Sequence, residues 1–116
     1  MNTVTEIIPA AINYEENESF QDAFKPLSAF FSAISKDGRI GATHIAVYAA
    51  MLQYRVSNGF VNPICVFSRQ IMPIAKISTA ETYCRCATQL SEYGYINYVP
   101  SFKRTQGSKI YFPEYM

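Results

Sequence analysis

Residues 67–96, FSRQIMPIAKISTAETYCRCATQLSEYGYI, hold two helical patterns separated by a short break, and this stretch decides the fold. In the second pattern, Ser78 followed by Glu81 is typical of a capping box, in which each side chain bonds to the other residue's backbone amide. Apolar residues then recur at helical spacing, and Gly94 predicts the end of the helix. The expected inward face is made of Tyr83, Cys86, Ala87 and Leu90.

The first pattern begins at Ser68, which we expect to cap a helix that extends through Ile71, Ile74 and Ala75. Pro73 falls inside this pattern. Proline has no amide hydrogen and its ring crowds the preceding turn, so the helix is predicted to be short or bent.

Two more helices and a strand are predicted upstream. Pro26 suits the first position of a helix that ends at a turn over residues 35–38. Thr43 is the expected N-cap of the next helix, which Asn58-Gly59 would end. Residues 64–67 form a short apolar run with a β-branched bias, which indicates a strand. The apolar face of the first helix is expected to be Leu27, Phe30, Phe31 and Ile34, and that of the second Ile45, Tyr48, Ala49, Leu52 and Val56.

After Gly94 the apolar period changes from helical to alternating. Residues 96–100 alternate in polarity, and residues 109–112 form a matching run. The loop between them, residues 102–108, is basic and contains a glycine. Two short strands joined by such a loop predict a β-hairpin.

The composition is that of one small folded domain. The chain has 116 residues, of which 49% are hydrophobic and 15% aromatic, enough to build a core. No apolar run reaches the roughly 20 residues of a membrane span, and the first residues lack the pattern of a signal peptide. We therefore expect a cytoplasmic protein that does not contact membranes.

Charge is distributed unevenly along the chain. Residues 1–35 carry one lysine and five acidic residues, whereas residues 36–112 carry nine lysines or arginines and three acidic residues. A basic body is what binding to a polyanion requires, although a well-solvated surface would show the same composition.

The predicted order of helix, helix, strand, helix, helix and hairpin resembles the winged helix-turn-helix family. Within residues 27–112, the segments 67–72, 77–83 and 90–96 look like the paired helices of that family and their exit into the wing. The hairpin sequence is similar to the wing of short regulators found on bacterial mobile elements. The resemblance implies an α+β, mainly α fold, in which a three- to four-helix bundle carries a small C-terminal β-hairpin wing. That domain would span residues 26–116, after an acidic N-terminal arm over residues 1–25.

The family binds double-stranded DNA, so the resemblance implies a sequence-specific transcriptional regulator. Residues 79–93 would form the recognition helix in the major groove, and residues 102–109 would lie along the backbone or in the minor groove. On the outward helix face, Arg85 suits guanine or a phosphate and Gln89 suits adenine, whereas the Glu81 carboxylate would be repelled by phosphates unless it caps the helix. The candidate DNA contacts are Arg69, Lys76, Thr79, Thr82, Arg85, Thr88, Gln89, Lys103, Arg104, Gln106 and Lys109.

Other functions remain open at this point. The acidic arm and the aromatic first helix would suit a protein-interaction module, or a homodimer contact within a DNA-binding protein. A replication or excision accessory protein would bind DNA with a different biological role. We expect no enzyme, cofactor or small-molecule ligand, because no catalytic or phosphate-binding motif is present. The three cysteines and one histidine do not have the spacing of a metal site, and Cys86 is expected to be buried with Cys84 near the surface.

Overall fold

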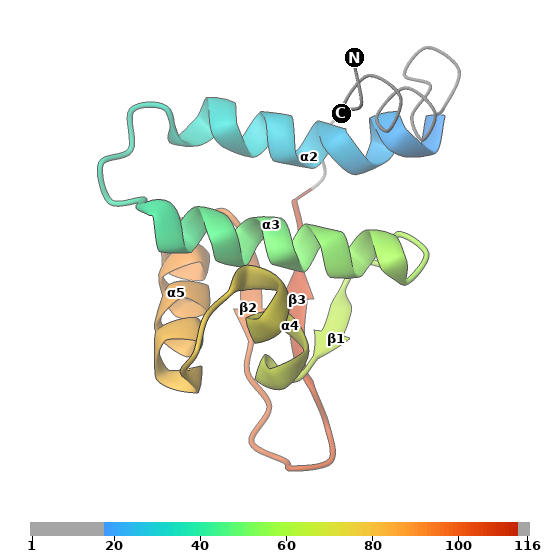
Figure 1. Ribbon diagram of the computed structural model, residues 1–116, viewed down its shortest axis with the longest axis vertical. Coiled ribbons are helices and arrows are strands. Elements are labelled where there is room, and N and C mark those ends of the chain that lie inside the picture. The colour runs from blue at the N-terminus through green and yellow to red at the C-terminus, as the bar shows by residue number, and fades with distance from the viewer. Residues whose placement is uncertain (1–17, 114–116) are drawn as a thin grey trace, which may run out of the picture.

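The computed structural model describes residues 18–113, with side chains from Phe24 onward. This part of the chain is an α+β unit, mainly helical, with four helices and one three-stranded antiparallel sheet (Figure 1). The elements in chain order are α2 (Glu18–Ile34), α3 (Ala42–Ser57), β1 (Ile64–Val66), α4 (Ser68–Ala75), α5 (Ala80–Glu92), β2 (Asn97–Val99) and β3 (Ser108–Tyr111).

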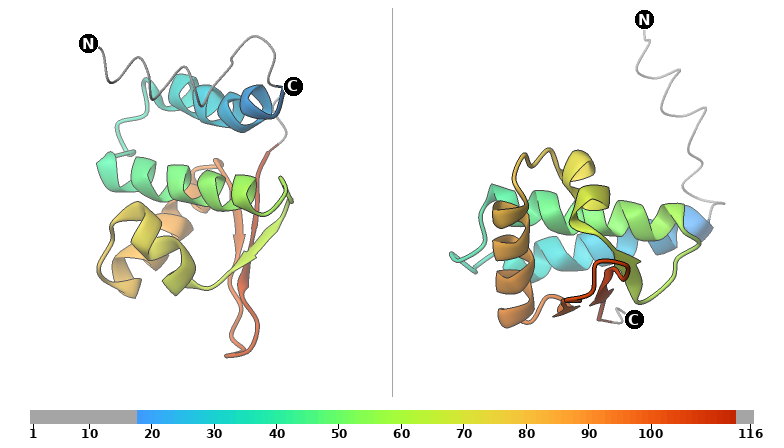
Figure 2. Two further views of the ribbon diagram at one scale, coloured as in Figure 1. Left: turned by 45° about the vertical axis from the view of Figure 1, so that its right-hand side comes forward. Right: turned by 90° about the horizontal axis from the view of Figure 1, so that it is seen from below.

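Helix α3 is the centre of the molecule. It contacts α2 on one side and α4 and α5 on the other, and the sheet lies on the same side as α4 and α5 (Figures 1 and 2). The apolar residues that surround most of α3 explain this position, because such a helix must be covered on more than one side. Its buried residues are Val47, Tyr48, Ala50, Met51 and Leu52.

Helix α2 begins earlier than the sequence pattern predicted. The expected first residue, Pro26, lies inside a helix that starts at Glu18, so residues 18–25 belong to α2 and not to an arm. Proline removes only one backbone hydrogen bond, and Phe30, which is fully buried against α3, helps to hold the helix across it. The remainder of the predicted arm, residues 1–17, lies outside the described residues.

Two predicted N-caps were also wrong by one or two residues. Helix α3 is capped at Gly41, not at Thr43, because the backbone N–H of Gly41 donates to Nδ1 of His44 (3.0 Å). Helix α4 is capped at Phe67, not at Ser68, because the N–H of Phe67 donates to Oε1 of Gln70 (2.8 Å). In both cases the side chain three residues into the helix supplies the cap. The predicted end of α3 at residues 58 and 59 is confirmed, with Gly59 at φ 79°.

The sheet has the order β1-β3-β2. The predicted hairpin is β2 and β3, with Tyr98 opposite Ile110. The predicted short strand, β1, also pairs with β3 and places Ile64 opposite Ile110. The side chains of Ile64, Val66 and Ile110 are buried, so this pairing fixes the hairpin to the core. The backbones approach so closely at Gly107 that a Cβ there would lie 2.8 Å from the carbonyl of Val66.

Asn62 extends the pairing of β1 with β3 beyond the last strand residues. Its Nδ2 donates to the backbone oxygen of Phe112, and its Oδ1 accepts from the backbone N–H of Phe112, both at 2.9 Å. The side-chain amide thus takes the place of a backbone amide in an antiparallel ladder. Phe112 is 5% exposed, so these bonds also hold an apolar anchor in the core.

Replacing Asn62 with Ala is expected to lower the free energy of unfolding by about 1–3 kcal/mol, because both backbone groups of Phe112 lose their partner. Urea unfolding of the variant measures this change. Asn97→Ala, an exposed substitution on β2 at the other edge of the sheet, is the control and should stay within about 0.5 kcal/mol of the parent chain. Equal stability of Asn62→Ala and the parent chain would contradict the role given to this side chain.

Candidate nucleic-acid interface

Helix α5 presents a buried face and an exposed polar face. Tyr83, Cys86, Ala87 and Leu90 are buried, as the helical spacing predicted. Cys86 is buried and Cys84 exposed, which confirms the prediction for these two thiols, and their positions lie about 200° apart around the helix. Among the predicted contacts on α5, Arg85 and Thr88 are exposed, so both are available to a partner.

The start of α5 differs from the predicted capping box. The N-cap is Thr79, whose Oγ1 accepts from the N–H of Thr82 (3.2 Å), so Ser78 is not the cap and Glu81 does not fold back onto it. Thr79 is extended and stands three residues before Thr82, which is the geometry that the cap requires. The two threonine hydroxyls are also hydrogen-bonded to each other (2.9 Å). Glu81 remains an exposed carboxylate in the first turn, where the helix dipole favours it and where it would repel phosphates.

Gln89 is turned toward α3. Its Oε1 lies 2.7 Å from Nε2 of His44. Because Nδ1 of His44 accepts from Gly41, the neutral Nε2–H form of the ring fits both bonds. Gln89 therefore positions α5 on α3, and its carbonyl oxygen, which pairing with adenine would use, is already engaged. The sequence had placed Gln89 on the outward face, and the contact with His44 could not be read from its spacing.

The loop between β2 and β3 is exposed and cationic. Lys103, Arg104 and Gln106 are exposed on it, and Lys109 is exposed on β3. The loop is ordered by a turn in which the N–H of Gln106 donates to the carbonyl of Lys103 (3.2 Å). Two serine hydroxyls support it, since Ser101 Oγ accepts from the N–H of Lys103 and Ser108 Oγ accepts from the N–H of Ser101.

Phe102 is a residue that the sequence interpretation missed. Its side chain is 95% exposed and it precedes the two cations of the loop. A large apolar side chain in this position has no role in the core. Its place in a polar, basic loop was the one signal in the sequence that could have identified it as a contact residue.

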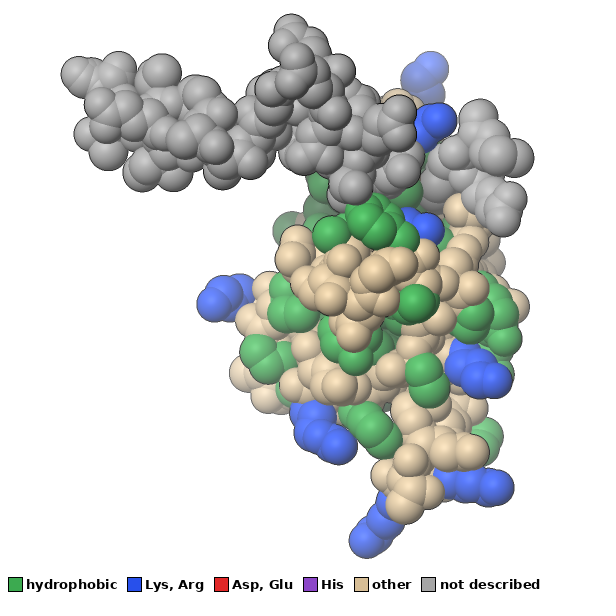
Figure 3. All heavy atoms as spheres, turned by 90° about the vertical axis from the view of Figure 1, so that its right-hand side faces the viewer, with side chains coloured by type: hydrophobic (Ala, Val, Ile, Leu, Met, Phe, Trp, Pro, Cys, Tyr) green, Lys and Arg blue, Asp and Glu red, His purple; other side chains and the backbone are tan. Residues whose placement is uncertain are grey.

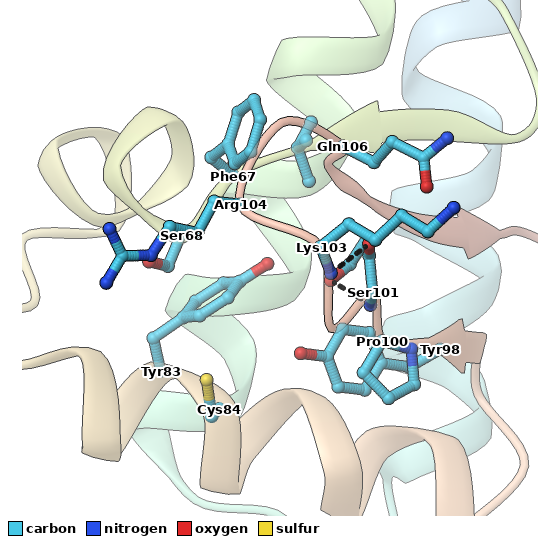
Figure 4. Close-up of a pocket in the computed structure, with 12 residues that line it drawn as sticks. Phe67, Ser68, Tyr83, Cys84, Tyr98, Pro100, Ser101, Lys103, Arg104 and Gln106 are labelled. Carbon is cyan, nitrogen blue, oxygen red and sulfur yellow. Dashed lines mark hydrogen bonds between the residues drawn. The ribbon is translucent and has the colours of Figure 1, made fainter.

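The first turn of α5 and the hairpin loop lie at the same end of the molecule, away from α2 (Figures 1 and 2). Between them is a cavity of about 310 Å³, lined from α5 by Tyr83 and Cys84 and from the hairpin by Tyr98, Lys103 and Arg104 (Figure 4). Burial raises the pKa of Tyr83 above its ordinary value of 10, and burial also raises the pKa of Tyr98. Both phenols are therefore protonated hydrogen-bond donors at neutral pH.

Two further predicted contacts lie at the ends of α4. Arg69 is exposed in the first turn, with its guanidinium 4.2 Å from the centre of the Phe67 ring. Lys76 is exposed at the C-cap and has a left-handed backbone, with φ 62°. The structure thus places these two cations at opposite ends of α4, the helix that precedes α5.

The cations of this region have no acidic partner within residues 24–113. In that range the one ion pair joins Arg39 to Asp37, at 2.8 Å. On the face shown in Figure 3, Lys and Arg side chains project from the end that carries the hairpin, and none of the coloured side chains is acidic. The positive charge is therefore available for an external anion. The cations of this region that have no acidic partner among residues 24–113 are Arg69, Lys76, Arg85, Lys103, Arg104 and Lys109.

The Asp37–Arg39 pair fixes the other end of α5. Asp37 accepts from Arg39 Nε and Nη2, both at 2.8 Å, and from the hydroxyl of Tyr95, just beyond α5. The Arg39 guanidinium also lies 4.1 Å from the centre of the Tyr93 ring. These bonds, first those from Arg39 and then that from Tyr95, hold the pKa of Asp37 well below its ordinary value. The carboxylate thus joins the turn after α2 to the residues that follow α5.

In comparisons with known proteins, no family model, no curated protein and no solved structure matches this chain. Within the described part of the chain, no three histidine, cysteine or acidic side chains are grouped so that they could hold a metal ion. No helix there is long and apolar enough to cross a membrane.

Asp37→Asn is expected to lower the midpoint of thermal unfolding at neutral pH, because the amide cannot replace the carboxylate toward Arg39. The pKa of Asp37 is lower in the folded chain than in the unfolded chain, so the contribution of the carboxylate is complete above about pH 4 and decreases as the pH falls further. The difference in midpoint between the parent chain and the variant should therefore shrink from pH 7 to pH 2. A difference that stays constant over this range would show that the charge of Asp37 does not stabilise the fold.

Proposed function

We propose that this chain is a winged helix-turn-helix domain that binds double-stranded DNA and acts as a transcriptional regulator. The observation that carries the proposal is the placement of the exposed face of α5 beside a cationic hairpin loop, at one end of the molecule, with no acidic partner for these cations within residues 24–113. The element order and the antiparallel sheet are compatible with that architecture.

In this proposal α5 enters the major groove. Arg85 stands on the exposed face in the second turn of α5, one turn in from its start, where side chains can meet base edges. The backbone amides of the first turn, other than that of Thr82, from which the Thr79 hydroxyl already accepts, suit a phosphate. Glu81, in the same turn, repels phosphates. The contact of α5 with DNA therefore depends more on hydrogen bonds from Arg85 to a base than on attraction to the phosphates. Gln89 is left out of the proposed contacts because His44 holds it.

The hairpin loop supplies the electrostatic part of the affinity. Lys103 and Arg104 would contact the backbone or the minor groove, with Lys109 behind them on β3. Phe102, exposed beside them, suits an apolar contact with sugars or with a base step in the minor groove. Contacts of this kind position the domain on the duplex and carry little sequence information.

A second candidate function is protein contact through α2. Phe31, on the side of α2 away from the core, is 47% exposed, and Phe24, two turns earlier on the same side, is 53% exposed. An aromatic surface of this kind suits a homodimer contact or a different protein partner. The two functions are compatible, because α2 lies at the end of the molecule opposite the hairpin loop (Figure 1).

Duplex binding tests the proposal. We expect fluorescence anisotropy with mixed-sequence duplexes to show binding that weakens as salt rises. Replacing Arg85, Lys103 or Arg104 with Ala should flatten the slope of log affinity against log salt by roughly one unit for each cation that touches a phosphate. Lys36→Ala is the matched control, since this exposed lysine follows α2 at the opposite end of the molecule and should leave the slope unchanged. A folded chain that binds no duplex even at low salt would favour protein contact instead.

Base reading and phosphate contact are separated by comparing two variants. Arg85→Ala should cost about 1–3 kcal/mol of binding free energy on the preferred site and relax the preference at one base position. Lys103→Ala should weaken all sequences about equally, because a phosphate contact does not depend on sequence. Selection from random duplexes with the parent chain and both variants measures this. Full sequence preference in Arg85→Ala would place the reading residues elsewhere.

A further inference from the structure

The cavity between α5 and the hairpin has the size and lining of a small-molecule site. Its volume of about 310 Å³ is at the lower end of the range for ligand pockets in proteins. Val66, Phe67 and Pro100 form apolar walls, and Lys103 and Arg104 lie at the exposed rim. Such a cavity combines an apolar body with a few polar groups at defined places, as ligand pockets do.

The inner end of the cavity holds a hydroxyl without a hydrogen-bond partner among the described side chains and backbone. Tyr83 is 2% exposed, and its Oη makes no hydrogen bond to any residue in the range 24–113. Figure 4 shows the Tyr83 hydroxyl and the Cys84 thiol pointing from α5 toward the hairpin loop. The hydroxyls of nearby Ser101 and Ser108 already accept bonds from the loop backbone. A buried tyrosine hydroxyl normally has a partner, so an acceptor supplied by a ligand would complete this site.

We propose that this cavity binds a small aromatic acid, with its anionic group at the rim and a second oxygen at the inner end. Figure 4 shows the Arg104 guanidinium on the Ser68 side of the loop and the Lys103 amine on the opposite side, so Arg104 receives the acid group. Phe67 and Pro100 cover the ring, and the Tyr83 hydroxyl donates to the second oxygen. A DNA duplex is too broad and too convex to reach a hydroxyl that is almost fully buried, whereas a molecule of this size enters. Binding of the acid does not depend on the proposed function. Its regulatory consequence does, because an acid on Arg104 would compete with phosphates for this side chain.

The probe is 4-hydroxybenzoate, titrated into the isotope-labelled full chain and followed by amide chemical shifts. We expect saturable shifts at residues 66–68, 83–84 and 98–108. Tyr83→Phe should weaken binding of 4-hydroxybenzoate by about threefold to tenfold, the value of one hydrogen bond, and leave binding of benzoate unchanged, since benzoate has no oxygen at the inner end. The variant keeps the buried ring and removes a hydroxyl that has no partner among the described residues, so it should fold normally.

Two controls separate the parts of the site. Lys103→Ala with Arg104→Ala should weaken both acids but not methyl 4-hydroxybenzoate, which lacks the charge. Tyr93→Phe, the same change at the far end of α5, should alter neither affinity. The proposal is overturned if no saturable shift appears at the lining residues, or if Tyr83→Phe weakens benzoate and 4-hydroxybenzoate equally, which would mean that Tyr83 acts only through the fold.

Measuring duplex DNA binding with and without 4-hydroxybenzoate distinguishes this proposal from the proposed function. If 4-hydroxybenzoate binds and lowers duplex affinity, both stand. If it binds while no duplex binds at any salt concentration, the proposed function fails and the acid site stands. If it does not bind but Tyr83→Phe weakens duplex binding as much as Arg104→Ala does, the cavity is part of the DNA contact and the acid site is overturned.

Discussion

The fold depends on the burial of one ring, that of Tyr48 in the middle of α3. It stacks on Phe30 of α2 with ring centres 3.9 Å apart and planes 11° apart, and it meets Phe112 edge to face at 6.1 Å. Phe30 in turn meets Tyr95 edge to face at 5.4 Å. One aromatic cluster thus joins α2, α3, the end of the sheet and the segment after α5, and offset or edge contacts of this kind add to the free energy of simple burial.

The aromatic cluster lies at one end of the molecule, so it does not cover the first turn of α5 or the hairpin loop at the other end. Polar contacts then orient α5 from that fixed end: His44 holds Gln89, and Asp37 holds Tyr95. The first turn of α5 and the loop of the hairpin lie at the opposite end (Figure 1), and the side chains of Glu81, Lys103 and Arg104 are exposed there. Rigidity at one end and exposed cations at the other are what a domain needs if it is to present a helix to a partner in a fixed orientation.

The sequence alone predicted those features of the fold whose pattern is local and periodic. The inward face of α5, the end of α3 and the hairpin follow from spacing and turn residues, because burial selects every third or fourth residue of a helix. The caps were misplaced because neighbouring side chains compete for the same amides, and only the backbone geometry shows whether Ser78 or Thr79 is the cap. The pairing of β1 with β3 joins residues more than forty positions apart, and no local pattern encodes it. The cavity around Tyr83 could not be predicted for the same reason, since its walls come from β1, α4, α5 and both strands of the hairpin.

Under the proposed function, the arrangement of charge favours specificity over tight binding. Glu81 sits in the first turn of α5 with no partner within residues 24–113, where it opposes any phosphate that approaches the helix amides. The loop cations attract the duplex wherever it is, so they cannot distinguish sequences. The carboxylate of Glu81, one helical turn before Arg85, lowers the affinity of α5 for the DNA backbone at every sequence. Where Arg85 meets a guanine, two hydrogen bonds to the base offset this loss, and phosphate attraction alone does not supply them. The acidic residue therefore widens the difference in affinity between the right sequence and every other one, which is how specificity arises from a repulsive element.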